Sequence, residues 1–223
     1  MGFDFDPGSR SKLTRRDLPR FSGATLFQRI ARQVCEAECL PRKELFEAWE
    51  VARRTRRRFR GGRVLDLGCG HALLAQLLLL LDDSSDVALA VDTRLPNSAA
   101  RLSAALLSEW PRLAGRVQLI EGTLDSVQPR AGDLLVSCHA CGSLTDDVID
   151  QAIGVGARVA VLPCCHDKLV NDQGGLGGWL DAALAIDVTR AARLRGHGYT
   201  VHTLTIPAEI TPKNRLLLGE PRA

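Results

Sequence analysis

The sequence predicts an α/β protein in which a largely parallel, doubly wound sheet follows an N-terminal helical extension. Beyond Gly62, short apolar runs alternate with stretches of helical periodicity, as in proteins whose parallel strands are joined by helices. These apolar runs are nearly continuous, which is typical of strands that are covered on both faces. Before Gly61 the apolar residues recur at helical spacing instead. We therefore expect an extension over 1–60 and a sheet domain over 61–223.

The extension is expected to hold a leader followed by two helices. Residues 1–20 are polar and rich in turn formers, so we expect a loose leader there. A first helix follows Thr25, and Pro41 suits the first turn of a second helix. The second helix ends in an arginine run before the Gly61-Gly62 stop. The apolar residues at helical spacing are Leu26, Phe27, Ile30, Val34 and Cys35, and then Leu45, Phe46, Trp49 and Ala52.

The sheet domain is expected to contribute seven strands with helices between them. Four glycines within 171–179 predict a loop, and Asp187 is a plausible N-cap of the last helix. The expected strands lie within 63–70, 87–94, 116–122, 133–142, 157–167, 199–207 and 214–221. The expected helices lie within 71–81, 98–110, 145–154 and 187–195.

The first strand runs into a glycine-rich turn that has an acidic residue before it. Gly68 and Gly70 allow a tight turn and a close approach of the backbone to a ligand. A dinucleotide-binding fingerprint would need a third glycine where this chain has Leu73. A carboxylate at Asp66 suits a ligand with an ammonium group and no pyrophosphate, such as S-adenosylmethionine. Asp92 ends the second strand, where a carboxylate can accept hydrogen bonds from both ribose hydroxyls.

In these motifs the sequence resembles the class I S-adenosylmethionine-dependent methyltransferases, over about 61–223. The resemblance implies a Rossmann-like, seven-stranded sheet whose last strand is antiparallel and enters by a hairpin. It also implies an adenine contact after the third strand, where Thr123 occupies a commonly acidic position and Leu124 can pack on the ring. Cys138 is placed to line the methyl-donor side. The residues expected to bind S-adenosylmethionine are Asp66, Gly68, Cys69, Gly70, Asp92, Thr123, Leu124 and Cys138.

Two clusters of cysteine and histidine follow neighbouring strands, within 137–142 and 163–167. Both should face the crevice, because ligands of open α/β sheets bind at the carboxyl ends of the strands. Three interpretations are open: a zinc site, a catalytic or substrate-binding site, and small residues that pack at strand ends. Adjacent side chains in extended backbone point to opposite sides, which disfavours convergence of Cys164 and Cys165 on one ion. We therefore expect no metal site.

The same clusters resemble a narrower group, which includes the eukaryotic enzyme that methylates a ribose 2′-hydroxyl in the tRNA acceptor stem. The matching residues are His139, Cys141, Gly142, Thr145 and Asp146, then Cys164, Cys165 and His166, and then 210–215. The zinc-finger segments of that enzyme are absent here. The resemblance implies an RNA acceptor and a base that removes the hydroxyl proton. The candidate catalytic residues are His139, Asp146, Cys165 and His166, although Asp146 equally suits the first turn of a helix.

The net charge of +3 combines a basic N-terminal part with an acidic remainder. Residues 10–63 carry 16 Lys and Arg against 6 Asp and Glu, whereas residues 64–223 carry 13 against 18. Arginines at the end of the second helix can neutralise RNA phosphates, although such a run is often only a solvated helix face. The expected substrate-binding residues are Arg53, Arg54, Arg57, Arg58, Asn214 and Arg215.

Other functions remain open at this point. The acceptor could be a small molecule or a protein, or the chain could be a non-catalytic RNA- or protein-binding module that keeps the cofactor fold. Seven cysteines, an odd number, predict free thiols in a reducing cytoplasm. The chain also shows no signal peptide and no apolar run of membrane-spanning length, so we expect no membrane partner.

Overall fold

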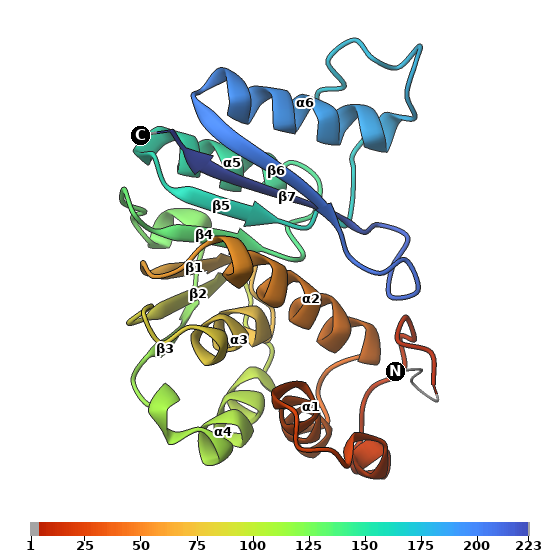
Figure 1. The fold of residues 1–223 in the computed structure, drawn as a ribbon, viewed down its shortest axis with the longest axis vertical. Coiled ribbons are helices and arrows are strands. Elements are labelled where there is room, and N and C mark those ends of the chain that lie inside the picture. The colour runs from red at the N-terminus through yellow and green to blue at the C-terminus, as the bar shows by residue number, and fades with distance from the viewer. Residues whose placement is uncertain (1–4, 223) are drawn as a thin grey trace.

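A computed structural model describes residues 5–222, and it places one seven-stranded sheet between two layers of helices (Figure 1). The strand order is β3-β2-β1-β4-β5-β7-β6, with β7 antiparallel to both of its neighbours and the remaining pairs parallel. This confirms the expected fold class, including the antiparallel last strand. The strands are β1 (Val64–Leu67), β2 (Ala88–Asp92), β3 (Val117–Glu121), β4 (Leu134–Ser137), β5 (Arg158–Val161), β6 (Tyr199–Thr205) and β7 (Arg215–Pro221).

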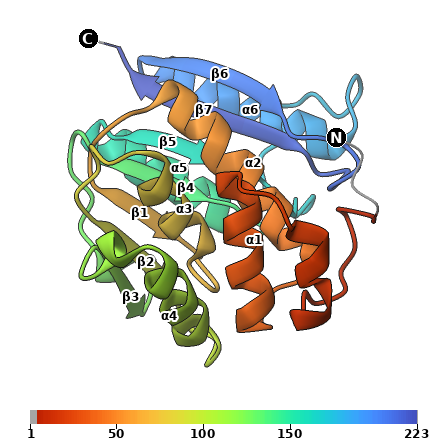
Figure 2. The same ribbon diagram turned by 60° about the horizontal axis from the view of Figure 1, so that its bottom comes forward.

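The helices divide between the two faces of the sheet because residues along each strand alternate between two hydrophobic clusters. Val64 of β1 belongs to a cluster with α1 to α4, whereas Leu65 and Leu67 belong to a second cluster with α5 and α6. Figure 2 shows the same division, with α6 on the far side of the sheet from α1 and α2. The helices are α1 (Leu26–Ala37), α2 (Arg42–Arg58), α3 (Leu73–Leu81), α4 (Ala99–Glu109), α5 (Leu144–Val155) and α6 (Ala182–Gly196).

The N-terminal extension shares its core with the sheet domain. Buried residues of α1 and α2 lie in the same hydrophobic cluster as those of α3 and α4. The expected loose leader is wrong for the described residues 5–20. Leu13 is fully buried, its backbone N–H donates to Leu40 O at 2.9 Å, and Lys12 forms a β-bridge with Pro41. Residues 1–4 lie outside the described part. The boundary at residue 60 stays a sequence-based proposal.

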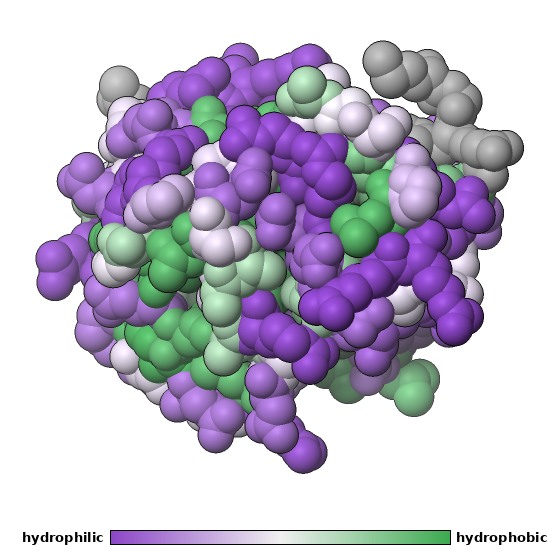
Figure 3. Space-filling model, turned by 90° about the horizontal axis from the view of Figure 1, so that it is seen from below, coloured by the Kyte–Doolittle hydropathy of each residue, from purple (hydrophilic) through white to green (hydrophobic). Residues whose placement is uncertain are grey.

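The face that carries α4 and α1 is mostly hydrophilic, with small and separate hydrophobic patches (Figure 3). This surface fits helices whose apolar sides are turned toward the sheet. Within the described residues, no helix has the length and apolar character that a bilayer crossing would require.

Three element boundaries that affect the site differ from the sequence-based expectation: the start of α6 and the ends of β4 and β5. Helix α6 begins at Ala182, with the Asp181 carboxylate accepting from the backbone N–H groups of Ala183 and Leu184. Asp187 is therefore inside the helix and is not its N-cap. Strands β4 and β5 end at Ser137 and Val161, so the cysteines and histidines that follow lie on loops.

One arginine of the run at the end of α2 is buried, which the sequence pattern did not reveal. Arg56 is 2% exposed and donates to Leu78 O at 3.1 Å and to Ser85 Oγ at 2.8 Å. Its Nη1 lies 3.2 Å from Asp82 Oδ2. Burial lowers the pKa of the Arg56 guanidinium to about 10, although the charge of Asp82 acts to raise it. Arg56 therefore joins α2 to α3 and to the segment that follows α3.

Replacing this arginine should destabilise the protein more than replacing its exposed neighbour. We expect Arg56→Met to lower the free energy of unfolding by about 3 kcal/mol, because Asp82 loses its buried partner. Arg57→Met changes an exposed side chain of the same type and should alter it by less than about 0.5 kcal/mol. Urea unfolding followed by circular dichroism measures both values. Equal values for the two variants would contradict this account.

Candidate active site

A cavity of about 1050 Å³ opens at the carboxyl edge of the sheet. The segments after β1, β2, β3 and β4 form most of its wall, with contributions from α5 and from the start of α2. This is the position at which open α/β sheets bind ligands. The lining residues are Glu44, Gly68, Gly70, His71, Asp92, Thr93, Gly122, Thr123, Leu124, Asp125, His139, Cys141, Leu144, Asp147, Asp150 and Gln151.

The glycine turn after β1 is held against the end of β2. Gly68 and Gly70 have φ values of +73° and +51°, which favour glycine because L side chains rarely adopt them. The Gly68 N–H donates to Val91 O at 2.9 Å, and the Gly70 N–H donates to Asp92 Oδ2 at 2.9 Å. Asp92 also accepts from the Arg94 N–H at 3.2 Å. The Asp92 carboxylate is thereby fixed on the cavity wall.

Asp66 lies beneath this turn and is 1% exposed. Its Oδ2 accepts a hydrogen bond from the Ala75 N–H at 3.1 Å, which places a carboxylate at the N-terminal turn of α3. Burial raises the pKa of the Asp66 carboxyl to about 7, with Asp92 acting in the same direction. Asp66 reaches a smaller cavity of about 40 Å³ under the turn, which Cys69 and Cys138 also line.

The remaining predicted cofactor residues divide between these two spaces. Thr123 and Leu124 line the large cavity, at the start of a short 3-10 helix (Leu124–Ser126). Leu124 also packs against the hydrophobic cluster on the α5 face of the sheet. Cys138 is 5% exposed and takes part only in the smaller cavity. The eight predicted residues thus gather around one continuous segment of the sheet edge.

His139 lies on the cavity wall opposite two acidic residues of α2. Its Nε2 lies 3.9 Å from Glu47 Oε2, and the side chain of Glu47 is 1% exposed. Glu47 Oε1 is paired with Lys43 Nζ at 3.1 Å, whereas Oε2 has no hydrogen-bond partner among the described residues. Burial raises the pKa of Glu44, which also lines the cavity, while His139 opposes this shift.

Sequence reasoning missed Glu44 and Glu47 as site residues. They lie three positions apart on the helix whose apolar stripe contains Leu45, Phe46, Trp49 and Ala52. Two acidic residues three positions apart lie on the same side of a helix, and these two adjoin apolar residues of the stripe. This was the one local signal that could have indicated them as site residues. Their proximity to His139 depends on how α2 lies across the sheet edge, which no local pattern contains.

Asp146 and His166 lie in a network behind the cavity wall. Arg190 of α6 is 2% exposed, and its guanidinium contacts Asp146 Oδ2 at 2.7 Å and Asp187 Oδ1 at 3.4 Å. His166 Nε2 lies 2.7 Å from Asp187 Oδ1. Despite burial, which acts the other way, hydrogen bonds from His166 and Arg215 hold the pKa of Asp187 below its usual range. Neither Asp146 nor His166 is among the residues that line the cavity.

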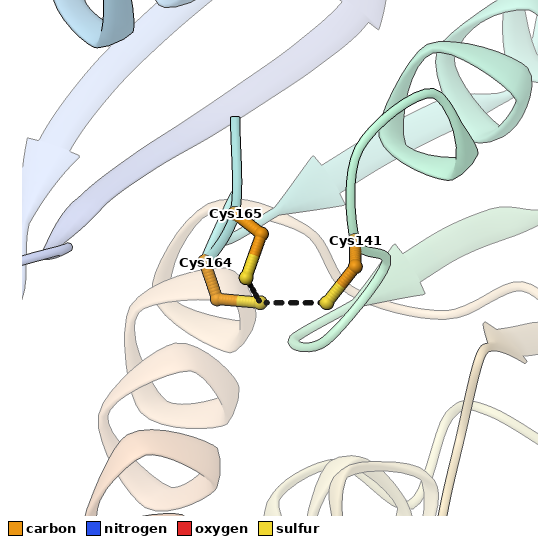
Figure 4. A group of neighbouring side chains, drawn as sticks. All are labelled: Cys141, Cys164 and Cys165. Atoms are coloured by element: carbon orange, nitrogen blue, oxygen red, sulfur yellow. Dashed lines mark hydrogen bonds between the residues drawn. The ribbon is translucent and has the colours of Figure 1, made fainter. Parts of the chain in front are cut away.

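Three cysteines of the two clusters meet (Figure 4), and one of them, Cys141, lines the cavity. Cys141 Sγ lies 3.4 Å from Cys164 Sγ, and Cys164 Sγ lies 3.8 Å from Cys165 Sγ. The expectation that Cys164 and Cys165 diverge is wrong, because their segment follows the end of β5 and is not extended strand. Cys165, predicted as catalytic, therefore belongs to a group of thiols.

The predicted substrate-binding arginines lie along α2, roughly 9 to 17 Å further along its axis than Glu47. Arg53 and Arg54 pair with Glu50, and Arg58 pairs with Glu220 at 3.2 Å. Arg57 is exposed. The two predicted residues near β7 serve the fold in this structure: Asn214 donates to Ile206 O at 3.0 Å, and Arg215 pairs with Asp187 at 2.7 Å.

Comparison with known proteins identifies the family. Residues 44–172, more than half of the chain, match a family described as a methyltransferase domain.

The chain belongs to this methyltransferase family.

Among solved structures, the ribosomal protein L11 methylase from Lactobacillus delbrueckii subsp. bulgaricus is 15% identical, with coverage of 79% of this chain and 77% of its own and a TM-score of 0.50. An O-methyltransferase family protein from Burkholderia thailandensis is 16% identical, with coverage of 93% and 68% and a TM-score of 0.48. No curated protein matches. At such identities the structural likeness concerns the fold alone.

The class I methyltransferase fold implies S-adenosylmethionine as the methyl donor, and the cavity fits this molecule. The cavity volume is ample for a ligand of this size. A Cβ atom built on Gly70 would meet no atom within 4 Å, so the turn leaves open space beside the fixed Asp92 carboxylate. Asp92 and Leu124 line this cavity, whereas Asp66 lines the smaller cavity beneath the turn.

The binding of S-adenosylhomocysteine should depend on pH through Asp66. Because burial raises the pKa of this carboxyl to about 7, Asp66 is mostly protonated below that pH and cannot attract an ammonium group as an anion. We expect affinity to fall by up to about tenfold for each unit as the pH drops from 7 to 5. Titration calorimetry across this range measures the slope.

Asp66→Asn is the matched control, since it keeps the size of the side chain and removes its titration. This variant should bind weakly and with little pH dependence between pH 5 and 7. A wild-type affinity that stays constant over this range would exclude Asp66 as the ammonium partner.

Proposed function

We propose that the protein transfers a methyl group to a ribose 2′-hydroxyl of RNA, with tRNA as the preferred acceptor, and that His139 removes the hydroxyl proton. The observation that carries the proposal is the position of His139 on the wall of the donor cavity, with the buried Glu47 carboxylate beside it. The resemblance of the two cysteine and histidine clusters to tRNA ribose methyltransferases supports the acceptor.

When bound, S-adenosylmethionine supplies an electrophilic methyl group, so the protein has to position a nucleophile and accept its proton. His139 is 41% exposed, which leaves its ring accessible to an acceptor that enters the cavity. An imidazole can accept a proton near neutral pH. The protonated ring would then face Glu47 Oε2 at 3.9 Å, and this carboxylate oxygen has no hydrogen-bond partner among the described residues.

Glu47 acts in this account as a positioning residue. Its carboxylate is buried at the side of α2 that faces the segment after β4, and Lys43 holds its other oxygen. A buried anion that lacks one partner favours a cation at short range. Glu47 therefore favours the imidazolium form that His139 reaches during the transfer and does not touch the acceptor itself.

The arginine run on α2 would contact RNA phosphates outside the cavity. Arg57 is exposed, and Arg58 is 48% exposed while paired with Glu220 at the surface. Surface ion pairs of this kind contribute little and exchange readily for phosphate contacts. Arg56 is excluded from this role because it is buried and paired with Asp82.

The acceptor is tested with labelled S-adenosylmethionine and four acceptor pools: unmodified tRNA transcripts, ribosomal RNA fragments, protein and metabolites. We expect label in tRNA, in nucleotides that resist alkaline hydrolysis because their 2′-hydroxyl is methylated. Asp92→Ala should abolish transfer together with S-adenosylhomocysteine binding. Label in protein or metabolites with none in RNA would overturn the proposed acceptor and leave the methyltransferase assignment intact.

Two variants separate proton removal from binding. We expect His139→Gln to retain S-adenosylhomocysteine binding and to lower kcat by about 10²- to 10⁴-fold. Glu47→Gln should lower kcat less, because the imidazolium formed during transfer loses a neighbouring carboxylate. His197→Gln, at an exposed position after α6, is the control. Unchanged turnover in His139→Gln would remove this residue from the mechanism.

The arginine run should make tRNA binding depend on salt. Replacing both Arg57 and Arg58 with Gln should reduce the slope of log affinity against log salt by up to about 1.8, since each phosphate contact contributes up to about 0.9. Replacing the exposed Arg130 and Arg195 removes the same charge elsewhere and serves as the control. An equal reduction in both double variants would show that only net charge matters, and not this surface.

A further inference from the structure

We infer that Cys141, Cys164 and Cys165 form a binding site for a thiophilic divalent cation, with zinc as the best candidate, and that the site keeps one coordination position open. Cys141 comes from the loop after β4, and the other two come from the segment after β5 (Figure 4). The site is distinct from the donor-binding turn, and its existence does not require that RNA is the acceptor.

The spacing of the three sulfur atoms matches the edge of a zinc coordination tetrahedron. With Zn–S bonds near 2.3 Å, two thiolates on a tetrahedral ion lie about 3.8 Å apart. The observed separations are 3.4 Å for Cys141 and Cys164 and 3.8 Å for Cys164 and Cys165. All three sulfurs lie within 4.8 Å of one another. The two separations that involve Cys164 thus lie within a few tenths of an ångström of the tetrahedral edge.

The two cysteine segments are fixed relative to each other by their backbones. The Gly142 N–H donates to Cys165 O at 3.2 Å, directly beside two of the three thiols. The Gly142 carbonyl in turn accepts from Arg190 Nη2 at 3.1 Å, and Gly142 has a φ of +60° that favours glycine. The pairing of His166 with Asp187 fixes the other side of the vicinal cysteines. The thiols therefore converge before any ion binds.

The charge around the cluster suits a thiolate site. Three thiolates and one divalent zinc ion sum to a single negative charge, and Lys213 Nζ lies 3.8 Å from Cys165 Sγ. A nearby ammonium group would thus favour ligation and balance the charge of the complex.

A set of three cysteine ligands matches zinc sites in which one coordination position is left for an external ligand. Such sites have three protein ligands and one open position, whereas structural zinc sites are closed by four. Within the described residues, no fourth cysteine, histidine or carboxylate ligand atom joins the group. Cys141 is exposed and lines the large cavity, so the open position lies at the cavity rim. An oxygen, nitrogen or sulfur donor of an incoming molecule could occupy it.

The test measures zinc content and affinity in protein that is purified under reducing conditions. Elemental analysis after equilibration with zinc and removal of excess should find one equivalent per chain. Cys141→Ala, Cys164→Ala and Cys165→Ala should each lower the affinity, measured by chelator competition, by ~100-fold or more. Cys39→Ala removes a buried thiol from another part of the core and should leave it unchanged. Lys213→Gln should lower it by about tenfold.

Cobalt substitution and S-adenosylhomocysteine binding complete the test. Cobalt-loaded protein should show the thiolate-to-cobalt absorption in the near ultraviolet, and each cluster variant should lose most of it. Retained S-adenosylhomocysteine binding shows that a variant is folded and keeps this result separate from the acceptor experiment. Zinc binding well below one equivalent at saturation would overturn the site. Unchanged affinity in the three cluster variants, or a Cys141–Cys164 disulfide that excludes zinc under reducing conditions, would overturn it equally.

Discussion

The carboxyl edge of the sheet depends on one buried positive charge, the guanidinium of Arg190. A cation that is 2% exposed needs close anionic partners, because the cost of removing it from water is large. Asp146 from α5 and Asp187 from α6 supply them. Arg190 also donates to Gly142 O, so the loop after β4 is held by the same group. Two helices and one loop are thus tied together at a single point.

This network explains the location of residues that the sequence had suggested as catalytic. Asp146 is occupied by Arg190 and by Asn171, whose amide lies 2.8 Å away. His166 is occupied by Asp187. Asp146 follows a strand that ends at the cavity, and His166 follows the neighbouring strand, which is why strand-end reasoning selected them. Their side chains, however, lie behind the cavity wall. His139 and Cys141, from the same stretch as Asp146, face the cavity. Within this short stretch of sequence, some side chains therefore line the cavity, and others hold the loop after β4 in place.

Sequence reasoning worked where the information is local. The glycine turn, Asp66 and Asp92 are fixed by the ends of two strands, so their meeting follows from the alternation of strands and helices. It failed where the partner is distant in the chain or the local signal is weak. Arg56 belongs to the same arginine run as the exposed Arg57, and its contacts with Asp82, Ser85 and Leu78, all distant in the chain, distinguish it. Glu47 meets His139 across 92 positions. The start of α6 was placed too late because Asp187 resembles an N-cap, whereas Asp181 fulfils that role.

The course of α2 has a geometric consequence for any acceptor that touches both of its ends. One helix carries Glu47, beside the cavity residue His139, and the exposed arginines roughly 15 to 17 Å further along its axis. Packing against α3 and the buried Arg56 leave this helix little freedom to slide or bend. The distance between an acceptor phosphate bound by these arginines and the acceptor atom in the cavity would then be set by the length of α2. If RNA is the acceptor, as proposed, α2 would act as a molecular ruler, and the methylated position would be selected by distance and not by the reading of bases.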